Sequence, residues 1–187
     1  QFVKGTAEVR YNYKIGHNQH LVGRMMAGAI YSYGNARISP YNEQFYIGGA
    51  NSLRAFTIRS IGPGRYRPEE KNAYSYLDQT GDLKFEANLE YRFPILGDLH
   101  GAAFIDTGNI WLIRNDDQRP GGQLKWGRFL KDLALDAGVG LRYDLTFIVI
   151  RLDMGIPLHV PYETDKNGYF NVPKYTPGWH LAIGYPF

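Results

Sequence analysis

The feature of this 187-residue sequence that most constrains its fold is an alternation of apolar and polar residues with a period of two. The clearest example runs from Leu83 to Phe93, where apolar side chains occupy every second position and Lys, Glu, Asn and Arg occupy the positions between. A period of two places the two sets on opposite faces of a β-strand. Segments 132–144 and 145–156 repeat the pattern. The sequence therefore predicts long strands with one apolar and one polar face.

Seven such segments are separated by clusters of Gly, Pro, Asn and Asp. They cover approximately residues 3–15, 20–33, 82–93, 99–111, 132–144, 145–156 and 178–187. Strands of soluble β-sandwiches average only about five or six residues. Strands of roughly 9–11 residues with an apolar outer face are what an outer-membrane barrel requires. We therefore expect an all-β fold, an antiparallel transmembrane β-barrel, with a soluble β fold as the alternative.

The composition excludes several classes of function. With 21 Lys and Arg against 18 Asp and Glu, the net charge of +3 gives no reason to expect a nucleic acid partner. The absence of Cys excludes a disulfide scaffold and a thiolate metal site, and it suits a protein that crosses an oxidising periplasm. No apolar run approaches the roughly 18 residues of a transmembrane helix.

The strand count indicates that more of the barrel precedes this sequence. Bacterial single-chain barrels have even numbers of strands and leave no open edge in lipid. The sequence opens with Gln1, without a leader, and its last strand finishes at Phe187. We therefore expect residues 1–187 to be the C-terminal part of a larger barrel. A complete eight-stranded barrel would instead need one more strand within residues 34–81.

Residues 34–81 form one long connection of about fifty residues, whereas most loops contain only a handful. Its first half places aromatic and aliphatic residues around Gly48, Gly49 and Arg54. A solvated loop does not need that apolar content, so we expect this part to pack against the rest of the protein.

These features resemble the outer-membrane assembly-factor superfamily, the barrels of BamA and TamA type that are also described as bacterial surface antigens. The resemblance is carried by residues 48–56 (Gly-Gly-Ala-Asn-Ser-Leu-Arg-Ala-Phe), 89–94 (Leu-Glu-Tyr-Arg-Phe-Pro), 104–111 (Phe-Ile-Asp-Thr-Gly-Asn-Ile-Trp) and the terminal strand. It implies about sixteen strands in the complete barrel, with periplasmic repeat domains upstream. The family's loop folds back into the barrel and carries an Arg-Gly-Phe motif at its tip, which matches Arg54, Ala55 and Phe56 with Ala in place of Gly.

The resemblance also implies that Arg54 lies inside the barrel, paired with an acid on each of two neighbouring strands, at the positions of Glu90 and Asp106. The alternation independently places both acids on the polar faces of their strands. A guanidinium can engage two carboxylates at once. From the sequence alone, an ordinary solvated loop arginine is the alternative.

The terminal strand is predicted to form the seam of the barrel. Its alternation predicts one lipid-facing row: Trp179, Leu181, Ile183, Tyr185 and Phe187. Gly184 weakens strand packing and Pro186 cannot donate to the ladder, so this edge should pair poorly. In the family, such a seam opens sideways and its edge templates incoming strands, and the terminal aromatic resembles the signal that assembly machines read on their clients.

The resemblance thus implies an integral outer-membrane protein of a Gram-negative bacterium that assembles, inserts or translocates other proteins. Its partners would be outer-membrane lipids, unfolded outer-membrane protein clients, and accessory lipoproteins or periplasmic proteins. Two alternatives remain: a dedicated secretion translocator of the same superfamily, and a passive porin or barrel enzyme.

An enzymatic activity, a cofactor or a metal site is not expected. Glu90 and Asp106 could form a glycosidase pair, but an adjacent arginine suits an ion pair better than a general acid. The serines lie in no Gly-x-Ser-x-Gly motif, and His17 and His20 have no neighbouring carboxylates that would complete a metal site.

Overall fold

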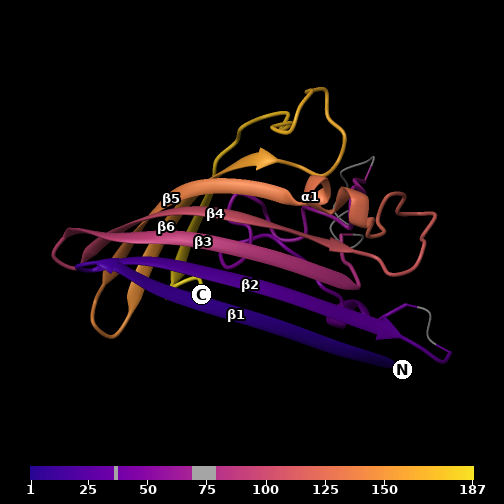
Figure 1. The fold of residues 1–187 in the computed structure, drawn as a ribbon, viewed down its shortest axis with the longest axis horizontal. Helices are drawn as coiled ribbons and strands as arrows, with labels where there is room; N and C mark the ends of the chain where they lie inside the picture. The colour runs from indigo at the N-terminus through magenta and orange to yellow at the C-terminus, as the bar shows by residue number, and fades with distance from the viewer. Residues whose placement is uncertain (36–37, 69–78) are drawn as a thin grey trace.

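The computed structural model describes residues 1–35, 38–68 and 79–187. Its strands form one antiparallel sheet in which the spatial order of the strands is their order in the sequence (Figure 1). The strands are β1 (Phe2–Gly16), β2 (Gln19–Ser32), β3 (Leu83–Leu96), β4 (Leu99–Trp111), β5 (Ala134–Asp144), β6 (Val149–His159) and β7 (Gly178–Ile183). The sheet is open, with β1 and β7 at its edges. The prediction of seven antiparallel strands is confirmed, with six of them 11 to 15 residues long and β7 shorter, at 6 residues.

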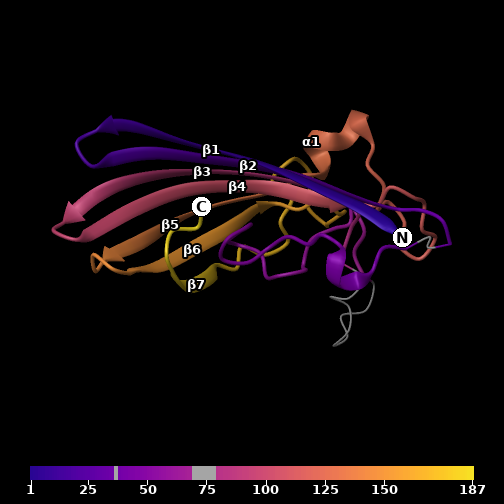
Figure 2. The same cartoon turned by 90° about the horizontal axis from the view of Figure 1, so that it is seen from below.

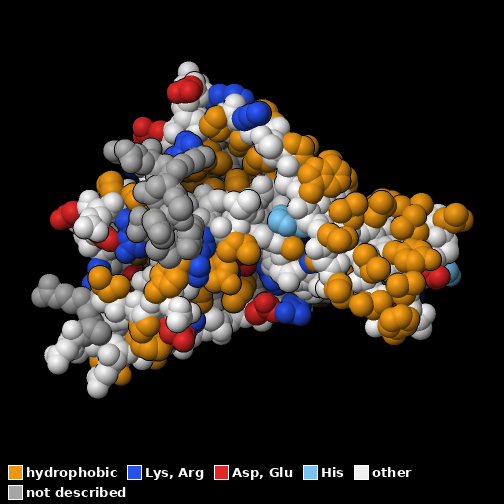
Figure 3. Space-filling model, turned by 180° about the vertical axis from the view of Figure 1, so that it is seen from behind, with side chains coloured by type: hydrophobic (Ala, Val, Ile, Leu, Met, Phe, Trp, Pro, Cys, Tyr) orange, Lys and Arg blue, Asp and Glu red, His pale blue; other side chains and the backbone are white. Residues whose placement is uncertain are grey.

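The two faces of the sheet differ as the alternation predicts. On β3, Glu86, Asn88 and Glu90 are buried on the concave face. On the opposite face, Leu89 and its cross-strand partner Ile105 are 46% and 50% exposed. Figure 3 shows hydrophobic side chains covering the part of the molecule toward the hairpin turns. Exposed apolar side chains such as Leu89 and Ile105 on the outer face are what a lipid-facing barrel wall presents.

Two strand boundaries differ from the prediction by four residues, and the others by three or fewer. The segment predicted at 145–156 begins only at Val149, because residues 145–148 form the hairpin turn, with Thr146 at a φ of 71°. The strand predicted at 178–187 ends at Ile183, because Gly184 has a φ of 82° and turns the chain out of the ladder.

The long connection after β2 lies on the concave side of the sheet (Figure 2). In its described residues, 38–68 and 79–81, it contains the short 3-10 helix η1 (Tyr41–Glu43), a bridge between Phe45 and Gly81, and no strand. Its buried apolar side chains pack with residues of the strands and of the connection after β6 into one cluster: Ile30, Phe45, Ile47, Leu53, Phe56, Ile61, Ile110, Ala134, Val160 and Val172. This segment therefore fills the hollow of the sheet.

The two ends of the sheet carry different connections (Figure 1). Short turns join β1 to β2, β3 to β4 and β5 to β6 at one end, and the long connections lie at the other. One of these contains the 3-10 helix η3 (Trp126–Arg128) and the helix α1 (Phe129–Asp132). No helix in the described ranges is both long and apolar enough to cross a membrane.

Candidate functional site: the loop tip on the concave face

The tip of the long connection, residues 48–57, is a compact turn held by its own backbone. Gly49 N–H donates to the Phe56 carbonyl at 2.8 Å, and Phe56 N–H donates to the Leu53 carbonyl at 3.1 Å. Gly48 and Gly49 have φ values of 98° and 93°, a region that side chains strongly disfavour. A Cβ on Gly48 would also collide with the carbonyl of Thr57. The two glycines therefore allow the tip to close.

Arg54 projects from this tip into the polar face of the sheet and is 1% exposed. Its Nη1 lies 2.5 Å from Glu90 Oε2, while Nε and Nη2 lie 2.8 Å and 3.0 Å from the two oxygens of Asp106. The guanidinium also stacks on the ring of Phe104, 3.4 Å from its centroid. The structure thus brings together Arg54, Glu90 and Asp106, with a two-pronged contact to Asp106.

The charge of Arg54 is fixed by these contacts. Burial alone would lower the pKa of Arg54, but the hydrogen bond to Asp106 and the charges of Asp106 and Glu90 raise the pKa above its ordinary value. Arg54 therefore remains a cation at any pH at which the protein is folded.

The buried charges extend beyond this trio. Arg142 joins Glu90, at 3.0 Å, to Asp153, at 2.5 Å. Arg151 contacts Asp153 at 3.3 Å and donates to the Ala50 carbonyl at 3.0 Å. The polar face carries five arginines and five acids around the tip: Arg24, Arg54, Arg92, Arg142, Arg151, Glu86, Glu90, Asp106, Asp136 and Asp153. Charged side chains of both signs therefore surround the region that holds the loop.

The sequence prediction assigned no role to most of these residues. Arg142, Arg151 and Asp153 stand on the polar side of the alternation, so their orientation was readable. Their partners were not, because residues such as Arg142 and Glu90 are separated by 52 residues that include β4 and the long connection after it.

The backbone of the tip is anchored as well as its side chain. Arg54 N–H donates to Asp106 Oδ2 at 3.3 Å, and Ala55 N–H donates to Asp136 Oδ2 at 3.2 Å. Ala55 is not among the described non-glycine residues with positive φ, so alanine is compatible with the backbone at this position. Phe56 is 8% exposed and belongs to the apolar cluster beneath the tip.

Two glycines of the wall make room for the tip, a feature that the sequence prediction missed. Gly155 on β6 and Gly178 on β7 are register partners. A Cβ on Gly155 would lie 2.8 Å from the Ala55 nitrogen, and one on Gly178 would lie 3.1 Å from the Arg54 carbonyl oxygen. The missing side chains let the loop backbone lie directly against the last two strands.

The terminal residues occupy two different faces. Trp179 and Ile183 are 62% and 73% exposed on the outer face of β7, as predicted. After Gly184 the chain turns inward, so the predicted lipid-facing row does not continue through Tyr185 and Phe187. Both rings lie instead beside arginines of the polar face, at distances where cation–π attraction is favourable.

The contacts of this turned-in segment are specific. The Arg92 guanidinium lies 4.3 Å from the centroid of the Tyr185 ring and donates to the Phe187 carbonyl at 3.4 Å. The Phe187 ring lies 5.2 Å from Arg24 and 5.9 Å from Arg54, and Pro186 is buried between these aromatics. The C-terminal residues therefore contact the same charged network as the loop tip.

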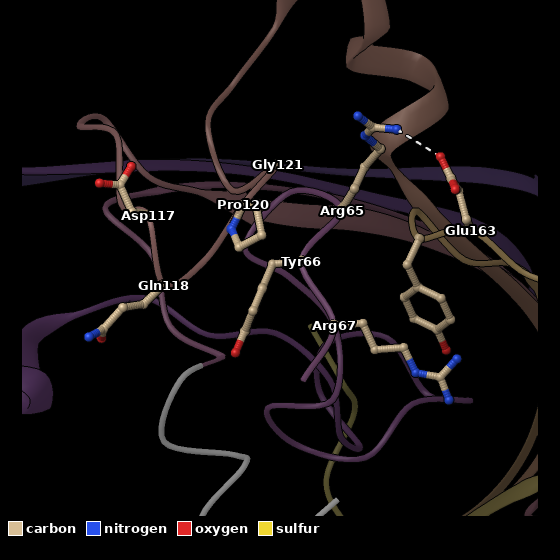
Figure 4. Close-up of a pocket in the computed structure, with 9 residues that line it drawn as sticks. Arg65, Tyr66, Arg67, Asp117, Gln118, Pro120, Gly121 and Glu163 are labelled. Carbon is tan, nitrogen blue, oxygen red and sulfur yellow. Dashed lines mark ion pairs between the residues drawn. The ribbon is translucent and has the colours of Figure 1, made fainter. Parts of the chain in front are cut away.

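A cavity of about 700 Å³ lies elsewhere, at the end with the long connections (Figure 4). Arg65, Arg67 and Glu163 line it, and Arg65 lies 3.6 Å from Glu163. Within residues 1–35, 38–68 and 79–187, no three His, Cys, Asp or Glu side chains are grouped so that they could hold a metal ion. Arg54, Glu90 and Asp106, each no more than 1% exposed, form a buried ion network, and a cavity of about 500 Å³ beside the tip is lined by Arg24, Gly48 and Glu86.

Comparison with known proteins identifies a family and a similar fold. A family model described as the Omp85 superfamily domain matches residues 1–187. An outer membrane protein assembly factor BamA from Nitratidesulfovibrio vulgaris (strain Hildenborough) is 30% identical over 159 residues, which are 84% of this chain and 18% of that protein. The crystal structure of BamA from Haemophilus ducreyi lacking POTRA domains 1-3 has a similar fold, with a TM-score of 0.61 at 16% identity, over 98% of this chain and 35% of that chain. The chain thus spans about a fifth of the length of its curated relative.

Proposed function

Because the chain belongs to the Omp85 superfamily, we propose that residues 1–187 form the C-terminal part of the barrel of an outer-membrane protein assembly or insertion factor. The protein would be integral to the outer membrane of a Gram-negative bacterium and would act on unfolded outer-membrane proteins, with accessory lipoproteins or periplasmic proteins as further partners. It would catalyse no reaction on a small molecule.

The observation that carries this proposal is the fixed position of the loop tip. Arg54, Glu90 and Asp106 are each no more than 1% exposed, and every charge among them has an opposite charge within 3 Å. Removing one partner of a buried ion pair typically costs about 3–5 kcal/mol, because the other charge is left buried and unpaired. A passive pore could be narrowed by a loosely held loop, whereas a loop held this firmly supports a role as a rigid internal brace.

The second element of the proposal is the edge formed by β7. It has 6 residues in the ladder, against 11 in β6, because the chain leaves the sheet at Gly184. The following Pro186 has no N–H to donate. A short edge with unpaired backbone groups can accept an added strand, so we propose that β7 lines the lateral seam at which a client strand pairs.

A cross-link across the seam tests this proposal. Since this chain has no Cys, one cysteine at Leu181 and one on the facing first strand of the intact protein would give a reversible closure. Insertion of an unfolded test barrel into liposomes should stop on oxidation and return on reduction.

The control is a cysteine pair at Leu89 and Ile105, which are register partners inside the sheet and exposed on its outer face. It should leave insertion unchanged. Undiminished insertion with the seam closed would refute the seam mechanism. Passage of one dedicated protein across the membrane, without insertion of test barrels, would favour the translocator of the same superfamily.

A further inference from the structure

A short segment between β4 and β5 alternates basic and apolar side chains. Residues 125–132, here called the basic turn, read Lys-Trp-Gly-Arg-Phe-Leu-Lys-Asp and contain η3 and α1. Trp126 and Leu130 are 81% and 72% exposed. Such large apolar side chains beside cations are costly in water and suit the boundary between lipid and headgroups.

The basic turn lies against the outer face of the sheet. Phe129 packs on Trp111 and Phe85, with ring centroids 5.5 Å and 5.4 Å apart. Phe85 belongs to the apolar row of β3, opposite the buried polar row. Figure 2 shows α1 on the face of the sheet opposite the long loop. The exposed Trp126 and Leu130 therefore stand at the rim of the proposed lipid-facing wall.

A basic pocket adjoins this turn. It encloses about 490 Å³ between the basic turn and the connection after β6, and four cations line it: Arg65, Arg128, Lys131 and Lys166. Arg65 pairs with Glu163, and Arg128 pairs with Asp132, each at 3.6 Å. Among the described residues, no carboxylate lies within ion-pair distance of Lys131 or Lys166, and Lys166 lies 4.5 Å from the centroid of the Tyr175 ring. The pocket therefore carries a surplus of positive charge.

We infer that this pocket binds the phosphate of a phosphorylated lipid in the leaflet at the long-connection end, with the acyl chains along Trp126 and Leu130. The inference rests on the proposed membrane placement, because in outer-membrane barrels the short turns face the periplasm and the long loops face the exterior. The cations complement the charge of the phosphate, and the adjacent apolar side chains offer a surface for the acyl chains of the lipid. A soluble anion would use only the first of these features.

Binding of lipid A to the detergent-solubilised intact protein tests the inference. Arg128→Gln with Lys131→Gln should weaken binding about tenfold or more, because it removes two of the four cations that line the pocket. Arg10→Gln with Lys14→Gln, which removes the same charge from β1, is the matched control and should bind as wild type. Trp126→Ser should weaken binding of both lipid A and its dephosphorylated form, whereas the arginine and lysine changes should affect only the phosphorylated lipid.

Equal lipid A affinity of wild type and the Arg128/Lys131 variant would overturn the inference. So would inorganic phosphate binding as tightly as the lipid, since the site would then be one for a free anion. Client insertion into phosphatidylcholine vesicles that lack lipid A, measured on the same proteins, separates the two proposals. It should be unaffected by these substitutions, and its failure in wild type would count against the insertase alone.

Discussion

At the scale of single residues, Arg54 organises the interior through three kinds of contact. It pairs with two acids, stacks on Phe104, and presents its backbone N–H to Asp106. Lysine could supply the charge but neither the planar stack nor the two-pronged contact. The partners of Arg54 were expected from the sequence for two reasons. The alternation placed Glu90 and Asp106 on the polar faces of their strands, and the loop motif resembled that of a known family.

The coupling between Arg54 and Asp106 can be measured by a double-mutant cycle. Arg54→Ala and Asp106→Ala should each destabilise the barrel in denaturant by about 3 kcal/mol, and the double variant should cost at least about 1 kcal/mol less than the sum. The exposed pair Lys4 and Glu43, at 3.2 Å, is the control and should couple by less than about 1 kcal/mol. Additive costs at Arg54 and Asp106 would show that the pair is not a unit.

Gly155 and Gly178, here called the glycine seat because the backbone of the loop tip lies directly against them, give a second residue-scale prediction. In Gly155→Val, the new Cβ would lie within 3.0 Å of the Arg54–Ala55 backbone and should displace the tip, at a cost of about 1–3 kcal/mol. Hydrogen exchange of residues 48–57 should accelerate. Gly5→Val on β1, where no heavy atom lies within 4 Å of the added Cβ, is the control. Equal exchange of residues 48–57 in the two variants would contradict the proposal that the glycine at position 155 holds the tip in place.

At the scale of elements, the strands could be predicted from the sequence but the two non-strand segments only in part. Alternation determines a strand's faces, so β1 to β6 were found with small errors at their ends. The turned-in C-terminal segment was not, because the parity of Tyr185 and Phe187 continues the outer row while the reversal depends on the backbone at Gly184. The seat at Gly155 and Gly178 was also missed, since a contact made by absent side chains leaves no hydrophobic signal.

The turn at Gly184 can be tested by β-branched substitution. Gly184→Val places a side chain at a φ of 82°, so it should strain the turn by about 1–2 kcal/mol. The strain should weaken the hydrogen bond that the backbone N–H of residue 184 donates to the Val149 carbonyl. Amide exchange of β7 should therefore rise. Gly168→Val is the control, because Gly168 also has a positive φ, 101°, and open space around it, but lies in a connection. Unchanged exchange of β7 would mean that the turn does not set the length of the strand.

At the scale of the whole molecule, the chain is a curved wall with an apolar outer face, a charged inner face and a loop bound to that inner face (Figures 1 and 2). The loop touches β3, β4, β5 and β6 through Glu90, Asp106, Asp136 and Arg151. The loop therefore links β3 and β4 to β5 and β6, which lie nearer the free edge at β7. We propose that this link holds the wall in shape while the seam at β7 opens and closes.

The most direct test of this account is the insertion of an unfolded test barrel into liposomes by the intact protein, as wild type, Arg54→Ala and Arg67→Ala. Arg67 lies in the same loop but is exposed, so its variant controls for loss of a loop arginine. The account predicts that wild type and Arg67→Ala accelerate protected insertion and that Arg54→Ala, folded and present in equal amount, does so at least about tenfold less. Equal rates for Arg54→Ala and wild type, or steady ion conductance without insertion by any of the three, would contradict it.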